Sequence, residues 1–143
     1  MILYAESSAV LSWLLGEPEG SKVAEALDSA TFVVSSELTL VECDRALHRA
    51  AHLETLPDGS IEDCRSVLQQ AASRWILLTL ASPIVQRARE PFPEEPLRSL
   101  DALHVASALE ARTSEPSLAL LSLDHRVRRC GRALGMEILP PNA

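Results

Sequence analysis

Aromatic residues and long apolar runs are scarce in this chain of 143 residues. Aromatic residues make up only 3% of it, so a core must be built mainly from leucine, valine, alanine and isoleucine. No apolar run reaches the ~18 residues that a membrane-spanning helix needs, and no basic segment precedes the apolar N-terminus as in a signal peptide. We therefore expect a cytoplasmic protein with no membrane partner, folded as a single domain over residues 1–143.

Cysteine is also infrequent, and its number is odd. The three cysteines lie far apart in the sequence and match neither a disulfide framework nor a zinc-binding spacing. Because a free cysteine behaves as a small apolar residue, we expect Cys43, Cys64 and Cys130 to fill space on helices.

Lysine is nearly absent, since Lys22 is the one lysine among 13 basic residues and the others are arginines. The net charge of −7 by itself argues against nucleic acid as a partner. The segment DHRVRRCGRALG nevertheless gathers four arginines, which on the residues alone favour a solvated helix face. Because arginine binds phosphate in a bidentate manner, the other interpretation is a phosphate-binding edge formed by Arg126, Arg128, Arg129 and Arg132.

Short apolar runs alternate with amphipathic segments along the whole chain. This alternation, with strands that are apolar almost throughout, is typical of an α/β fold. We expect three layers: a central, mostly parallel five-stranded sheet with helices on both faces. The predicted strands are 2–5, 31–35, 75–80, 117–123 and 136–139, and the predicted helices are about 7–15, 21–30, 36–50, 60–73, 99–112 and 124–135, with another beginning at Ser82.

Acidic residues lie where the predicted strands end, which is the edge at which open α/β sheets bind ligands. Glu6 follows the first strand and Asp124 follows the fourth, whereas Glu42 and Asp101 lie in early turns of helices. Several carboxylates around one cleft repel each other unless a cation offsets them. An all-oxygen donor set is typical of Mg²⁺ or Mn²⁺, and such ions activate water for attack on a phosphodiester.

Each acid also has an ordinary structural explanation when it is taken singly. A negative charge near a helix N-terminus, as at Asp101 or Asp124, is favoured by roughly 0.3–1 kcal/mol. Glu42 is spaced to pair with Arg45 on the same helix face. The metal hypothesis therefore depends on the four acids meeting in one place.

Three of these acids lie within longer motifs. LTLVECDRAL contains Glu42, LRSLDALHVASAL contains Asp101, and LLSLDHRVRRCGRALGMEIL contains Asp124. Together, and in this order along essentially the whole chain, they resemble the PIN domain family and specifically its VapC-type ribonuclease toxins. The resemblance implies a PIN-like three-layer fold, and it implies that these three acids bind the metal and take part in catalysis.

The N-terminal motif departs from the family pattern. The family has an aspartate with a small polar partner where this chain has AESSAV, so Glu6 takes the position of the first metal ligand and Ser8 that of its partner. Glutamate has the same charge on a longer side chain, and a misplacement of about 1 Å can cost on the order of a hundredfold in rate. We expect Glu6 to bind the metal by adopting a different rotamer.

The positions of other residues near the acids suggest further roles. His104 lies one turn beyond Asp101 and is expected to support the metal ligands, as is Ser8. Arg126, Arg128 and Arg129 are expected to contact RNA phosphates beside the metal.

The leading interpretation is a Mg²⁺- or Mn²⁺-dependent endoribonuclease, the toxin of a type II toxin–antitoxin pair. The resemblance implies an RNA substrate, a homodimer, and a VapB-like antitoxin that covers the acidic groove. One alternative is a weakened or inactive PIN-like module that binds antitoxin or RNA without cleavage, and its only support is Glu6. Another is a phosphoacceptor domain, which needs a lysine near the strand ends, whereas Lys22 falls on the second predicted helix.

Overall fold

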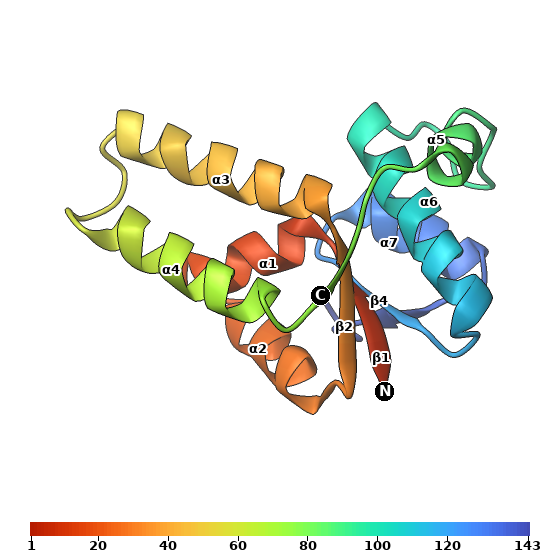
Figure 1. Ribbon diagram of the computed structural model, residues 1–143, viewed down its shortest axis with the longest axis horizontal. Coiled ribbons are helices and arrows are strands. Elements are labelled where there is room, and N and C mark those ends of the chain that lie inside the picture. Colours follow the sequence, from red (N-terminus) through yellow and green to blue (C-terminus); the bar gives the residue numbers. More distant parts are fainter.

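A sheet of five parallel strands forms the centre of the computed structural model, which describes residues 1–143 (Figure 1). The strand order is β3-β2-β1-β4-β5, and every neighbouring pair is parallel. The predicted α/β fold is confirmed, and the sheet is entirely rather than mostly parallel. The strands are β1 (Ile2–Ala5), β2 (Phe32–Ser36), β3 (Ile76–Leu78), β4 (Ala119–Leu121) and β5 (Glu137–Leu139).

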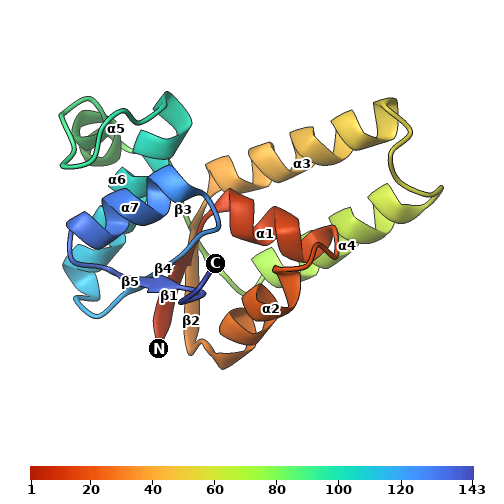
Figure 2. The same cartoon turned by 180° about the vertical axis from the view of Figure 1, so that it is seen from behind.

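Seven helices cover the two faces of this sheet (Figures 1 and 2). The first four pack on one face and the last three on the other, which completes the three predicted layers. None of them combines the length and the apolar character that crossing a bilayer requires. The helices are α1 (Ser7–Leu14), α2 (Gly20–Ser29), α3 (Glu37–His52) and α4 (Ser60–Ala72) on the first face, and α5 (Ser82–Ala88), α6 (Ser99–Ser114) and α7 (His125–Ala133) on the second.

Each face of the sheet has its own apolar core, because successive strand residues point to opposite sides. Tyr4 of β1 packs into the core beneath α6 and α7, whereas its neighbour Leu3 packs into the core beneath α1 and α2. Both cores are built mainly of aliphatic residues. Cys130 is buried in the first core and Cys43 in the second, as expected for cysteines that fill space on helices.

Two strands are three or four residues shorter than predicted. β3 covers residues 76–78 of the predicted 75–80, and it lies at the sheet edge with one strand neighbour. β4 covers residues 119–121 of the predicted 117–123. Because β4 ends early, Ser122 lies beyond the strand and its hydroxyl contacts Glu6 at this edge of the sheet, whereas Leu123 packs against the core beneath α1 and α2.

Candidate active site

The structure brings all four predicted acids together in one pocket of about 450 Å³ at the carboxyl edge of the sheet. Glu6 follows β1 directly, and Asp124 is the N-cap residue of α7, just beyond β4. Asp101 lies in the first turn of α6, and Glu42 lies in the second turn of α3. Because parallel strands end at the same edge, segments far apart in the sequence meet here.

Glu6 is buried, with 4% of its surface exposed, and its carboxylate is held by hydroxyl groups. The Ser7 hydroxyl donates to Oε1 over 3.0 Å, and the Ser122 hydroxyl donates to Oε2 over 2.7 Å. The Ser8 hydroxyl donates a short hydrogen bond to Oε2 as well. A buried carboxylate needs donors of this kind, and here no cationic side chain is among them.

The same serines connect Glu6 to the backbone before Asp124. Ser8 Oγ accepts hydrogen bonds from the backbone N–H groups of Leu123 (2.9 Å) and Asp124 (3.1 Å). Ser122 Oγ also accepts from the Asp124 N–H over 3.1 Å. The position of Glu6 is therefore coupled to the start of α7 through two hydroxyl groups.

Arg98, the residue before α6, bridges the two aspartates. Its Nε lies 2.9 Å from Asp101 Oδ2, and its Nη2 lies 3.3 Å from Asp101 Oδ1 and 3.1 Å from Asp124 Oδ2. The hydrogen bond to Asp101, together with the negative charge of both aspartates, raises the pKa of the Arg98 guanidinium. This side chain therefore stays charged and offsets part of the repulsion between the acids.

Glu42 is held from the other side by a buried histidine. His104 Nε2 makes a short hydrogen bond to Glu42 Oε1, and its Nδ1 lies 2.9 Å from the Tyr4 hydroxyl. A carboxylate accepts, so Nε2 carries the proton that it donates to Glu42. Burial raises the pKa of the Tyr4 phenol, which therefore remains protonated and can donate to Nδ1. The chain Tyr4–His104–Glu42 thus fixes the orientation of this acid.

Two exposed arginines line the same pocket and were missed by the sequence interpretation. Arg45 and Arg49 lie three and seven residues after Glu42 on α3 and therefore share its helix face. That spacing was available in the sequence, where Arg45 was weighed only as a partner of Glu42. Ser122 and Tyr4 were also missed, and only tertiary contacts bring them to the site. Arg98 was missed as well, although it lies three residues before Asp101, and only its contact to Asp124 is tertiary.

The expectation that Arg128 contacts RNA is wrong. Its side chain is buried, and its guanidinium donates to the backbone carbonyls of Ser122 (2.7 Å), Leu139 (3.3 Å) and Pro140 (2.7 Å). Those carbonyls lie at the ends of β4 and β5, so Arg128 joins two strands to α7. Arg126 and Arg129 are exposed, but neither lines the acidic pocket, and Arg129 pairs with Glu94 over 3.1 Å.

The donor set of this pocket suits a hard divalent cation. As the side chains lie, no three His, Cys, Asp or Glu residues form a group that could hold a metal ion. One nitrogen of Arg98 nevertheless contacts both Asp101 and Asp124, so a single positive centre can reach both carboxylates at once. Carboxylate oxygens are the ligands of Mg²⁺ and Mn²⁺, whereas zinc prefers nitrogen and sulfur.

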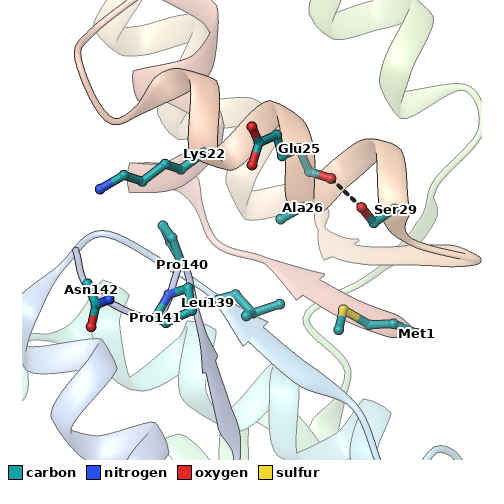
Figure 3. Close-up of a pocket in the computed structure, with 9 residues that line it drawn as sticks. All are labelled: Met1, Lys22, Glu25, Ala26, Ser29, Leu139, Pro140, Pro141 and Asn142. Atoms are coloured by element: carbon teal, nitrogen blue, oxygen red, sulfur yellow. Dashed lines mark hydrogen bonds between the residues drawn. The ribbon is translucent and has the colours of Figure 1, made fainter.

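A second pocket, of about 440 Å³, lies between α2 and the C-terminal segment (Figure 3). It contains Lys22 and Glu25 of α2 and Pro140 and Asn142 of the C-terminus. None of its residues belongs to the acidic pocket. No lysine therefore lines the candidate site, as a phosphoacceptor domain would need.

The PIN domain family model matches residues 3–133 of this chain. The chain is 32% identical over 142 residues to ribonuclease VapC35 of Mycobacterium tuberculosis, covering 98% of this chain and 97% of that protein. Its fold is similar to that of VapBC2 from Rickettsia felis bound to a promoter DNA fragment, with a TM-score of 0.66, 12% identity and coverage of 96% and 97%. It is also similar to M. tuberculosis VapC20, a sarcin-ricin loop cleaving toxin, with a TM-score of 0.62, 13% identity and coverage of 95% and 96%. The chain therefore belongs to the PIN domain family, alongside the VapC ribonucleases.

Proposed function

We propose that this protein is a Mg²⁺- or Mn²⁺-dependent endoribonuclease that acts as the toxin of a type II toxin–antitoxin pair. The observation that carries the proposal is the meeting of Glu6, Glu42, Asp101 and Asp124 in one pocket of a PIN fold. A relative that this chain matches over nearly its whole length is a ribonuclease, which supports the same activity.

Glu6, Glu42, Asp101 and Asp124 would hold the ion. A bound divalent ion supplies Lewis acidity toward water and toward the scissile phosphate. Three serine hydroxyls fix Glu6, and His104 fixes Glu42, so the carboxylates are positioned before the substrate arrives. Such preorganisation lowers the barrier because little rearrangement is left for the reaction itself.

Arg45 and Arg49 are the residues best placed to bind the RNA backbone. Both are exposed and line the pocket beside Glu42, so their guanidinium groups can hold phosphates next to the acids. In this proposal Arg45 and Arg49 take the place of Arg128 as RNA contacts. Arg126 and Arg129 do not line the pocket, and any contact that they make with RNA would lie outside it.

The proposed partner is a small VapB-like antitoxin, and the proposed assembly is a homodimer. The similar structure of VapBC2 supports a toxin–antitoxin partnership. A basic segment of the antitoxin would complement the four carboxylates and block access of RNA to them.

Cleavage of a pool of structured RNAs by the antitoxin-free protein, with Mg²⁺ and Mn²⁺ titrated, tests the activity. We expect metal-dependent cutting that falls at least about a hundredfold in Asp101→Asn, because a ligand to the proposed ion is lost. Asp28→Asn, which changes an exposed aspartate on α2, is the matched control and should cut as the wild type does. Cutting that persists in Asp101→Asn would contradict the proposed site.

Glu6→Asp, assayed in the same way, separates a nuclease from a binding module. A faster variant would show that glutamate lowers an existing activity. A silent wild type together with an active Glu6→Asp would identify a module inactivated at this one carboxylate.

A further inference from the structure

Arg98 covers the two aspartates from the solvent side. Its side chain is 63% exposed, whereas that of Asp101 is 8% exposed and that of Asp124 is 23% exposed. The guanidinium makes two hydrogen bonds to Asp101 and one to Asp124, and the Arg98 backbone N–H adds a fourth contact, to Asp101 Oδ2 over 3.3 Å. The arginine therefore uses carboxylate lone pairs that face the pocket.

No other cationic side chain forms an ion pair with either aspartate. Without Arg98, two carboxylates would face each other beside Glu6 and Glu42 with no positive charge between them. A guanidinium and a metal ion cannot occupy the same lone pairs, so loading of the ion requires Arg98 to move away. The high exposure of its side chain leaves it room to do so.

We propose that Arg98 is a built-in counter-ion that competes with a divalent cation for Asp101 and Asp124. The inference rests on the proposed function, since it takes these aspartates as ligands of the ion. It assigns a second state to the site: in the absence of metal, the guanidinium holds the acids together, and in its presence the guanidinium is displaced into the mouth of the pocket.

Mn²⁺ binding, measured by the loss of the free-ion EPR signal without any RNA, tests the proposal. We expect Arg98→Gln to bind Mn²⁺ about threefold to tenfold more tightly than the wild type, because exposed ion pairs of this kind are weak. Arg98→Lys keeps the charge but loses the bidentate geometry, so its affinity should lie between the two. Arg126→Gln is the matched control: it removes the same charge two residues from Asp124, where Arg126 forms no ion pair, and should change the affinity by less than about twofold.

Thermal unfolding, measured with and without Mn²⁺, shows whether the variants are folded and also tests the competition. Without metal, Arg98→Gln should have a lower melting temperature than the wild type. Saturating Mn²⁺ should raise the melting temperature of Arg98→Gln by more than it raises that of the wild type. Equal or weaker Mn²⁺ binding by Arg98→Gln, in a folded protein, overturns the proposal.

Asp101→Asn distinguishes this failure from a failure of the proposed function. Suppose that the wild type binds Mn²⁺ and Asp101→Asn does not. A Mn²⁺ affinity of Arg98→Gln equal to that of the wild type then overturns only the proposed competition, and the metal site stands. If neither the wild type nor Arg98→Gln binds Mn²⁺, both the competition and the metal site are overturned.

Discussion

Glu6 is buried at the end of the central strand, and the hydroxyl groups of Ser7, Ser8 and Ser122 hold its carboxylate. Hydroxyl donors satisfy the oxygens without cancelling the charge, so the carboxylate remains able to attract a cation. Asp101 and Asp124 differ in this respect, because Arg98 already offsets their charge. Within one pocket, the charge of Glu6 is therefore not offset by a cationic side chain, whereas the charges of Asp101 and Asp124 are offset by Arg98.

Ser122→Ala tests the hydroxyl support of Glu6. The substitution removes the 2.7 Å hydrogen bond to Glu6 and an acceptor for the Asp124 N–H. Since hydrogen bonds to charged groups contribute about 1.5–3 kcal/mol, we expect the free energy of unfolding to fall by about 2 kcal/mol in urea denaturation. Ser117→Ala, at an exposed position before β4, is the control. Equal stability of the two variants would show that the Ser122 bond contributes nothing.

At the scale of elements, α7 is joined to the sheet by a buried arginine. Arg128 donates to the carbonyl groups of Ser122 and Pro140, which directly follow β4 and β5, and to that of Leu139, the last residue of β5, which also accepts from the Ser122 N–H. Burial lowers the pKa of its guanidinium. The three carbonyl partners stabilise this buried cation in place of water.

Arg128→Met keeps an unbranched, mostly apolar side chain but removes the guanidinium donor to the Ser122 and Pro140 carbonyls. We expect it to lower the free energy of unfolding by about 2–4 kcal/mol, because buried polar groups left without partners are costly. The control Arg126→Met, at an exposed position of the same helix, should stay within about 0.5 kcal/mol of the wild type. A stable Arg128→Met with weakened RNA binding would restore the original expectation of a phosphate contact.

At the scale of the whole molecule, charge is distributed unevenly on an acidic protein. The net charge of −7 disfavours association with RNA as a whole, whereas the exposed Arg45 and Arg49 lie at the acidic pocket. Helices α3 and α4 extend together beyond the sheet (Figure 1), and α3 carries both arginines along this extension. We infer that RNA approaches the acids along α3.

The double substitution Arg45→Gln and Arg49→Gln tests this path. In EDTA, where no divalent ion is available, we expect the double variant to bind RNA more weakly than the wild type. The slope of log affinity against log salt concentration should become less negative by about 1–2. Arg74→Gln is the control, because Arg74 is exposed just before β3 and so lies at the opposite edge of the sheet. Fluorescence anisotropy of a labelled RNA over a salt series measures both quantities. An unchanged slope in the double variant would exclude phosphate contacts by these arginines.

The order of strands and helices follows from the sequence alone, because apolar runs and amphipathic periods are local properties of the chain. The positions of Glu6 and Asp124 at strand ends follow in the same way, and parallel strands then bring them to one edge. The spacing of Arg98 and Asp101 is local, but the bridge from Arg98 to Asp124 could not be assigned from it, since that contact depends on where the start of α6 meets the start of α7.

The sequence by itself therefore determined the α/β fold and the four acids, since both depend on short-range patterns and on the rule for parallel sheets. Only the tertiary structure decided which polar groups surround those acids. Arg128 is buried and Arg45 faces the pocket because helix packing sets which side of each helix meets the protein interior. Such contacts depend on distances between segments far apart in the chain, which no local pattern contains.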